Sequence, residues 1–199
     1  MTMASCAAIT AIICVLITTV ATIVAFSTPN WMEFDGKSGD MLCQCSDCDC
    51  GLWLHCTGGF SSTGSLDNCR WFFADDFLVE RTLPVWFKAV QGLMACALAS
   101  TMIALIVGLF SLCCECKGCN PNMAAAFFAN LTFILLAVSV CVFGAKAHME
   151  HKATVIQNQG ENLPTFGWSF WVAVGGAIMA LVSSLLYFCV GRKEDYLTY

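Results

Sequence analysis

One short stretch, from Cys43 to Cys56, concentrates the residue types that bind metals or form disulfides. It reads CQCSDCDCGLWLHC and holds five cysteines, two aspartates and a histidine within fourteen residues. The spacing Cys-x-Cys-x2-Cys-x-Cys, with His55 nearby, offers thiolate and imidazole ligands of the kind that zinc prefers. The same cysteines suit a group of disulfides if the segment lies in an oxidising compartment. The choice therefore depends on the elements around the stretch.

A second group of cysteines lies farther along the chain. It comprises Cys113, Cys114, Cys116 and Cys119, the last two of which form a Cys-x-x-Cys motif. Such a motif raises the hypothesis of a membrane thiol oxidoreductase that passes electrons to the first group. At the cytoplasmic end of a membrane helix, however, the same cysteines are candidates for reversible S-palmitoylation. Unmodified thiols are the plain alternative.

The composition places the chain in a membrane. Of its 199 residues, 58% are hydrophobic and 12% are charged, with a mean hydropathy of +0.73. A soluble domain carries about twice that share of charged residues, so the lipid bilayer is the first expected partner. The net charge is −5, so nothing indicates a nucleic-acid partner, which would require a basic face.

Four stretches are apolar over the length of about 20 residues that a membrane span requires. We predict spans at about 4–26, 89–114, 120–145 and 164–191, within a single domain of residues 1–199. The first stretch lacks a basic start and is longer than the apolar part of a signal peptide, so we interpret it as a retained span. The spans leave a first loop, 27–88, and a second loop, 146–163, on the same side of the membrane.

Two observations indicate the orientation. Lysine and arginine are denser on the side of the short turn and the two termini, which the positive-inside rule assigns to the cytoplasm, although their raw count is higher on the other side. The first loop holds six cysteines, which favours an oxidising exterior. We therefore predict cytoplasmic termini. The two groups of cysteines then face opposite sides of a hydrocarbon core about 30 Å thick, so the oxidoreductase hypothesis remains a remote alternative.

The first loop also carries a pattern that resembles a known family. A tryptophan follows the first span, and a Gly-Leu-Trp motif is followed by two cysteines. In a four-span protein this pattern resembles the claudin/peripheral myelin protein/epithelial membrane protein superfamily, and the likeness extends to segments 83–94 and 166–171. The residues that carry it are Trp31, Gly51, Leu52, Trp53, Cys56 and Cys69.

The resemblance implies the fold class and the roles of these residues. The fold would be all-α membrane, a four-helix bundle with a small extracellular antiparallel β-sheet from the first loop, joined by the second. A Cys56–Cys69 disulfide is implied, which would contribute about 3 kcal/mol by closing a short loop. Trp31 and Trp53 suit the membrane interface and would anchor the sheet on the helix ends. Gly51 allows a close backbone approach.

The four remaining cysteines of the loop are additional to the family's pair. Thiolate ligands would have to stay reduced, whereas this loop is expected outside the cell. We therefore predict two further disulfides and neither a metal nor another cofactor, with the connectivity open among fifteen possible pairings. The residues concerned are Cys43, Cys45, Cys48 and Cys50.

Two positions depart from the claudin pattern. Claudins carry an arginine in the second span where this chain has Gln91. The tail is also shorter and lacks the usual Tyr-Val ending. Its apolar residues Leu197 and Tyr199 alternate before the terminal carboxylate, which suits a PDZ groove, although a terminal tyrosine is not the usual fit.

Polar residues within the spans are few. Asn130 lies inside the third span, where an interhelical hydrogen bond is its expected role, and Gly175, Gly176 and Ala180 allow a neighbouring helix to approach closely. Apart from cysteine, no span has an ionisable side chain away from its ends, which disfavours a transporter. No catalytic dyad or phosphate-binding loop is evident, so we predict that the protein is not an enzyme.

Two functions remain. The favoured one is a claudin-like adhesion protein of the plasma membrane at cell–cell contacts, forming or regulating a paracellular barrier or path. Its partners would be copies of itself in the same or the opposing membrane, with a PDZ scaffold as a candidate. The alternative is an auxiliary subunit that modulates the gating or trafficking of a channel or receptor, as the calcium-channel gamma and stargazin-like relatives do.

Overall fold

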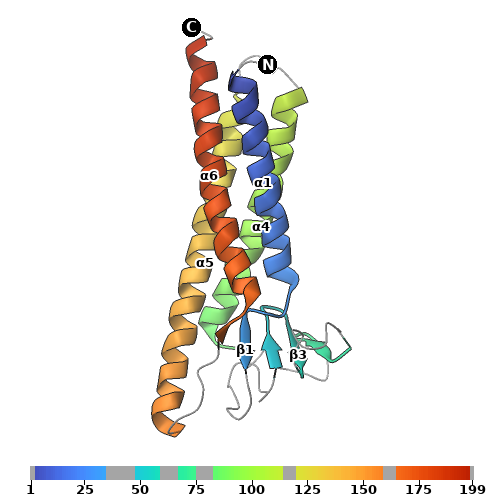
Figure 1. The fold of residues 1–199 in the computed structure, drawn as a ribbon, viewed down its shortest axis with the longest axis vertical. Coiled ribbons are helices and arrows are strands. Elements are labelled where there is room, and N and C mark those ends of the chain that lie inside the picture. Colours follow the sequence, from blue (N-terminus) through green and yellow to red (C-terminus); the bar gives the residue numbers. More distant parts are fainter. Residues whose placement is uncertain are drawn as a thin grey trace. The chain divides into compact units, whose positions relative to one another are not determined.

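Four long helices dominate the computed structural model, which describes residues 3–34, 48–58, 67–74, 83–113, 120–158 and 165–197 (Figure 1). Each contains a stretch of 22 to 29 residues that is long and apolar enough to cross a membrane. These stretches confirm the four predicted spans. The helices are α1 (Met3–Ser27), α4 (Val85–Cys113), α5 (Pro121–Asn158) and α6 (Trp168–Leu197).

The ends of α5 differ in how well the sequence predicts them. Asn120 caps its start, accepting a hydrogen bond from the backbone N–H of Met123 at 3.3 Å, and Pro121 occupies the first turn. The far end was expected at 145, but the helix continues to Asn158. Apolarity ends near Met149, whereas Glu150, Lys152 and Ala153, which follow, are good helix formers. Most of the predicted second loop is therefore helical.

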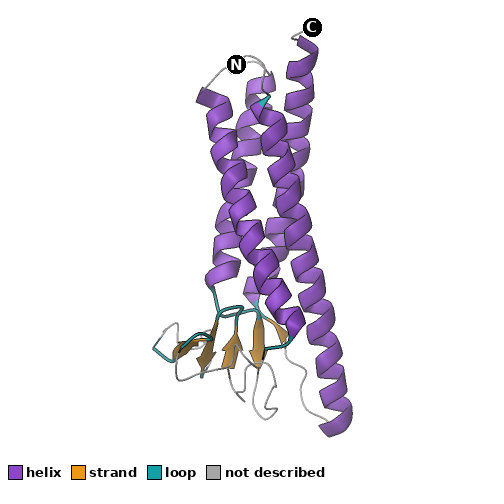
Figure 2. Cartoon of the chain, turned by 180° about the vertical axis from the view of Figure 1, so that it is seen from behind, coloured by secondary structure: helices purple, strands orange, loops and turns teal. Residues whose placement is uncertain are grey.

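A small antiparallel sheet lies in the first loop, as predicted (Figure 2). Its strand order is β4-β3-β2-β1-β5. The last strand comes from outside the first loop, directly before α6, in the segment expected to begin the fourth span. The strands are β1 (Met32–Phe34), β2 (Cys48–Cys50), β3 (Leu54–Thr57), β4 (Cys69–Trp71) and β5 (Thr165–Phe166).

The chain divides into two compact units, which we call unit 1 and unit 2. Unit 1 comprises residues 1–23, 93–138 and 174–199, and its described part is helical apart from Asn120. Unit 2 comprises residues 24–92 and 139–173 and contains the sheet. Each unit has its own way of packing.

Small and hydroxyl side chains hold the helices of unit 1 together. The Thr19 and Thr101 hydroxyls lie 3.1 Å apart, and the Ser183 hydroxyl donates to the Ala11 carbonyl at 3.3 Å. A Cβ added at Gly176 would lie 3.4 Å from the Ala21 Cβ, which agrees with the close approach expected there. The core of this unit consists of Ala11, Val15, Ala104, Ala125, Ala126 and Tyr187.

Candidate functional site

Trp31 is the central anchor of unit 2. Its side chain is fully buried, and the indole Nε1 donates to the Ala25 carbonyl at 2.7 Å. The ring meets Phe143 and Phe170 edge-on, with centroids 4.9 and 6.0 Å away. Trp31 thus joins the end of α1 to the unit 2 segments of α5 and α6. It lies inside the protein rather than at a lipid-facing interface.

Backbone hydrogen bonds from the same position fix the sheet to α6. The Trp31 N–H donates to the Cys50 carbonyl, and the Trp31 carbonyl accepts from Gly167, both at 3.1 Å. The Ser169 N–H donates to the Asn30 carbonyl at 3.1 Å. A Cβ at Gly167 would collide with the Asn30 backbone, so this junction accommodates only glycine. β1 is therefore tied to β2, β5 and the first turn of α6.

Gly51 begins the Gly-Leu-Trp motif at a point of close backbone approach. A Cβ at this position would lie 2.6 Å from backbone atoms of both Thr28 and Pro29. The Gly51 N–H donates to the Leu54 carbonyl at 2.9 Å, which closes the turn between β2 and β3. Trp53 packs at a tilt against Phe26, at the end of α1, with centroids 5.1 Å apart. The motif thus packs the sheet against the end of α1.

Gln91 completes the motif in a way that sequence reasoning missed. Its side chain is buried, and Nε2 donates to the Leu52 carbonyl at 2.6 Å. Leu52 itself is fully buried. In the sequence, Gln91 is notable only because claudins carry an arginine at this position. In the structure, the same side chain ties α4 to the first loop. The signal available in the sequence was an uncharged hydrogen-bonding residue near the start of an apolar helix.

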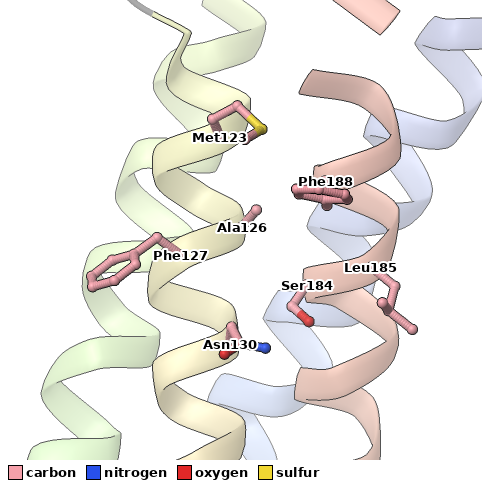
Figure 3. A pocket seen from close by; sticks show the side chains of 7 residues that line it. All are labelled: Met123, Ala126, Phe127, Asn130, Ser184, Leu185 and Phe188. Atoms are coloured by element: carbon pink, nitrogen blue, oxygen red, sulfur yellow. The ribbon is translucent and has the colours of Figure 1, made fainter. Parts of the chain in front are cut away.

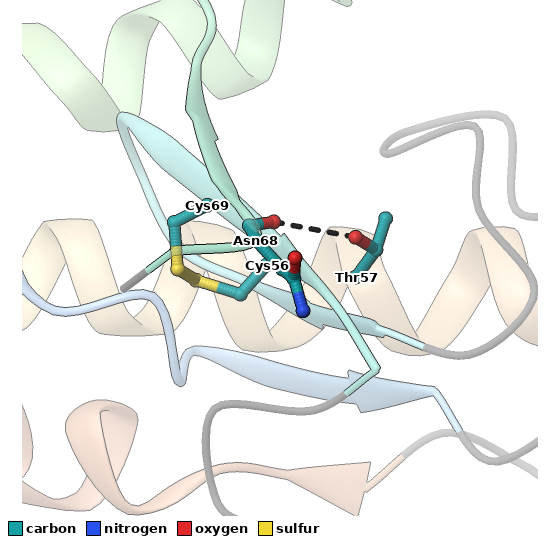
Figure 4. The surroundings of a disulfide bond; sticks show 4 residues. All are labelled: Cys56, Thr57, Asn68 and Cys69. Carbon is teal, nitrogen blue, oxygen red and sulfur yellow. Dashed lines mark hydrogen bonds between the residues drawn. A yellow bond between two sulfur atoms is a disulfide. The ribbon is translucent and has the colours of Figure 1, made fainter. Parts of the chain in front are cut away.

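The Cys56–Cys69 disulfide predicted from the resemblance is confirmed (Figure 4). The two cysteines face each other across the β3–β4 pair. Next to them, the Thr57 N–H and hydroxyl both donate to the Asn68 carbonyl, at 3.1 and 3.3 Å. The bond spans 13 residues of sequence and fixes the register of β4 on β3.

The additional cysteines are only partly described. Cys48 and Cys50, in β2, are buried and disulfide-bonded, and their partners fall outside the described residues. Cys43 and Cys45 also lie outside the described residues, so the two further disulfides remain a prediction and their connectivity stays open. Across the described ranges, no group of three or more histidine, cysteine, aspartate or glutamate residues could hold a metal ion.

His55 is the buried titratable group at the centre of the sheet. It pairs with Cys50 on one side and Arg70 on the other, and its ring stacks on Phe72 with centroids 6.0 Å apart. Burial lowers the pKa of the His55 imidazole, and the positive charge of Arg70 lowers this pKa further. The imidazole is therefore neutral near pH 7 and acts as a packing element.

β4 ends the sheet, since no other described strand pairs with its outer side. Arg70 and Trp71 are exposed, Phe72 is fully buried, and Phe73 is exposed again; Trp71 and Phe73 expose 57% and 53% of their surface. The inner face of Phe73 stacks on Trp53, 5.8 Å between centroids. We call Arg70, Trp71 and Phe73 the β4 edge. It places two large apolar side chains at the end of β4, with Trp71 as the last residue of the strand and Phe73 in the turn that follows.

The predicted palmitoylation sites and the predicted PDZ-binding tail both lie at the limits of the described chain. Cys113 ends α4, whereas Cys114, Cys116 and Cys119 lie outside the described residues, so acylation remains a prediction. α6 runs through Leu197, and Tyr199 lies outside the described residues. A PDZ groove binds an extended strand, so the end of this helix would have to unwind to enter one.

Comparison with known proteins agrees with this arrangement. Residues 9–189 match the sequence model of a family described as PMP-22/EMP/MP20/Claudin tight junction. The match includes the sheet, the second and third predicted spans, and most of the first and fourth. No curated protein matches the chain.

Proposed function

Because the chain belongs to the PMP-22/EMP/MP20/claudin family, we propose that it is a non-catalytic adhesion protein of cell–cell contacts. It would lie in the plasma membrane with both termini in the cytoplasm. Its first loop would meet that of another copy across the gap between two cells, and thereby form or regulate a paracellular barrier or path.

The observation that carries this proposal is the β4 edge. No described strand pairs with the outer edge of β4. Such an edge is a ready template for another chain, and proteins normally protect it with charge or cover. Here Arg70 is the single charge of the three residues, while Trp71 and Phe73 expose more than half of their surface. Tryptophan and arginine are also the residues most enriched among those that dominate binding energy at interfaces.

The rigidity of the sheet supports the same function. A docking loop that is already ordered loses less conformational entropy when it binds. β4 is held by the Cys56–Cys69 disulfide, and its neighbour β3 follows a motif fixed by Gly51 and Gln91. The surface is therefore organised before any partner arrives.

Epithelial cells that lack junctional strands provide the test. A tagged full-length chain is expected to concentrate at cell–cell contacts and to change paracellular conductance. Trp71→Ala should reduce the enrichment at contacts several-fold, with unchanged surface amount, because it removes the largest exposed side chain of the β4 edge. Surface biotinylation measures that amount.

The matched control is Trp171→Ala on α6, because Trp171 is exposed to a similar extent, 60%, but lies within a membrane span. It should leave the enrichment at contacts unchanged. Uniform surface staining with unchanged conductance would contradict the junctional role. Co-purification with a channel or receptor under those conditions would favour the auxiliary-subunit alternative instead.

A further inference from the structure

A groove runs between α5 and α6 in unit 1, and Figure 3 labels the seven residues that line it. Its volume of about 360 Å³ lies within the range of about 300–1,000 Å³ that is typical of small-molecule sites. Three of the lining side chains, those of Phe127, Leu185 and Phe188, are large, apolar and exposed. The groove is therefore open to the lipid beside the two helices.

Asn130 brings an amide into this apolar lining. Its side chain is exposed and points from α5 toward α6 (Figure 3). The Ser184 hydroxyl across the groove donates instead to the Leu181 carbonyl at 2.9 Å. Among the described residues, the Asn130 amide has no hydrogen-bond partner. An amide without a partner is costly in an apolar environment, so a bound molecule that supplies a hydrogen bond would stabilise this position.

The depth of Asn130 places the amide just inside the hydrocarbon. The apolar stretch of α5, Pro121–Met149, contains 29 residues, which extend about 43 Å at a rise of 1.5 Å per residue. This length exceeds the hydrocarbon core by about 13 Å. Shared between the two ends, the excess leaves Asn130 about 7 Å inside the boundary of the core. Bulk water does not reach the amide there, whereas the ester groups of a lipid lie close to this level.

Arg192 brings a positive charge to one end of the groove. It is exposed and lies in the last turn of the apolar stretch Trp168–Lys193 of α6. Its guanidinium carbon lies over the ring of Phe188, 5.2 Å from the centroid, so the side chain folds back along α6 onto a residue of the groove. The ring covers one face of the guanidinium, which leaves the N–H groups around its edge for a ligand. Arginine binds phosphate through such paired N–H groups.

The separation of the charge from the amide matches the polar part of a phospholipid. Phe188, on which the guanidinium lies, is four residues from Ser184, about 6 Å along α6, and Ser184 faces Asn130 across the groove (Figure 3). In a glycerophospholipid the ester carbonyls lie a few bonds below the phosphate, a separation of about one helical turn. A carboxamide has two N–H donors, and an ester carbonyl accepts from such a donor.

We propose that this groove binds one anionic glycerophospholipid, with its phosphate on Arg192, an ester carbonyl accepting a hydrogen bond from Asn130, and an acyl chain along the groove. The acyl chain would continue along Ile134 of α5 and Ile178 of α6, which are exposed deeper in the two spans. A sterol fits this site less well, because it has no anion for the guanidinium.

Lipid binding goes beyond the proposed adhesion, because it requires neither an opposing cell nor the β4 edge. In a cell it agrees with the proposed orientation, since anionic lipids give the cytoplasmic leaflet its negative surface potential and Arg192 lies near the proposed cytoplasmic end. The two proposals fail separately, because lipid binding is measured on the isolated chain, where no second cell is present.

The test titrates dioleoyl phosphatidic acid into the full-length chain in a neutral detergent and counts lipid adducts by native mass spectrometry. One saturable adduct is expected. Dioleoylglycerol, which lacks the phosphate, should bind about tenfold more weakly, the effect of losing a charge-assisted hydrogen bond. Glycerol 3-phosphate, which lacks the chains, should not displace the lipid at equal concentration.

Arg192→Gln should weaken the binding of phosphatidic acid about tenfold and leave the binding of dioleoylglycerol unchanged. The matched control is Lys193→Gln, because it removes the same charge from an exposed neighbour that points about 100° away around the helix. It should leave both affinities unchanged. Equal weakening in the two variants would show that only the overall charge of this helix end attracts the lipid, and would overturn the proposal.

Asn130→Leu tests the deeper contact and should weaken the binding of both lipids several-fold, because both carry the ester groups. Asn130→Gln keeps the carboxamide and should retain most of the affinity. Unchanged binding in Asn130→Leu would overturn the proposal. Displacement of phosphatidic acid by glycerol 3-phosphate, or by cholesterol at equal concentration, would overturn it as well, and so would an adduct that appears only without a second copy of the chain.

Discussion

The two units of this protein are held together by different chemistry. In unit 1 the helices meet through alanines, glycines and hydroxyl groups, with interhelical hydrogen bonds such as Thr19–Thr101. In unit 2 the packing rests on large rings around Trp31, on a disulfide and on backbone contacts that admit only glycine. Lipid gives apolar helices no hydrophobic reason to associate, so close approach and polar contacts hold them together in unit 1. In unit 2 the rings of Phe143 and Phe170 meet Trp31 edge-on where the sheet joins the helices, and ring pairs in this geometry add to the packing.

The comparison implies opposite sensitivities. Unit 2 should be damaged most when a large side chain is removed, since each buried ring carries much of the packing. Unit 1 should tolerate such losses at its lipid-facing positions but not the enlargement of a small residue at a helix contact.

The largest effect is expected for Trp31→Ala in unit 2. Removing a fully buried tryptophan typically costs about 3–5 kcal/mol, and this one also donates a hydrogen bond to Ala25. The free energy of unfolding, measured by SDS titration in mixed micelles, should fall by about 4 kcal/mol. The control is Trp168→Ala, a tryptophan that is 40% exposed. Equal losses in the two variants would show that Trp31 is not the anchor of unit 2.

Loss of the Cys56–Cys69 bond should follow in size. The double variant Cys56→Ala with Cys69→Ala avoids leaving one thiol to mispair and should lose about 3 kcal/mol. Because the bond fixes β4 on β3, junctional enrichment should fall with it. Cys141→Ala removes a free cysteine of the same unit and serves as the control. Unfolding that is unchanged in the double variant would mean that the strand pairing alone holds β4.

The features that the sequence predicted are those with a local signal. Apolar length identifies a span, and the Gly-Leu-Trp motif with its two cysteines identified the loop that became the sheet. The predicted start of the third span at about 120 agrees with the start of α5 at Pro121. In each of these cases a residue's role follows from its immediate neighbours.

The features that were missed depend on distant segments. Gln91 became informative only once the Leu52 carbonyl, 39 residues earlier, lay beside it. Trp31 was expected to anchor the sheet on the helix ends, but no local pattern in the sequence predicts that Phe143 and Phe170 enclose its ring. The end of α5 was placed too early because polarity marks the limit of the membrane, not the limit of a helix.

A moderate effect is expected when Gly108 is enlarged in unit 1. A Cβ at Gly108 would collide with the hydroxyl of Tyr187, which is fully buried. Overpacking of this kind costs about 1–3 kcal/mol. The Tyr187 hydroxyl has no hydrogen-bond partner among the described residues, so Tyr187→Phe should restore stability to Gly108→Ala.

The matched control for this glycine is Gly175→Ala on α6. An added Cβ there meets no atom within 4 Å, so the variant should keep or slightly raise stability through the better helix propensity of alanine. SDS titration compares all four chains. A Gly108→Ala chain that Tyr187→Phe does not rescue would locate the damage elsewhere than at this contact.

The smallest effect concerns pH and separates the units, because all three histidines lie in unit 2. The pKa of His55 is lowered in the folded loop by burial and by Arg70, relative to 6.5 in the unfolded chain. Below about pH 6.5 the unfolded chain therefore binds a proton at His55 that the folded loop does not bind. The contribution of neutral His55 to the free energy of unfolding is complete above this pH and declines as the pH falls. One proton limits the slope to about 1.4 kcal/mol per pH unit.

Hydrogen exchange of β3 amides between pH 7.5 and 5.5, corrected for the intrinsic rate, should show this loss of stability. His55→Gln should reduce the loss, and the amides of unit 1 should be unaffected. A decline of the same size in His55→Gln would assign the pH dependence to groups other than this imidazole.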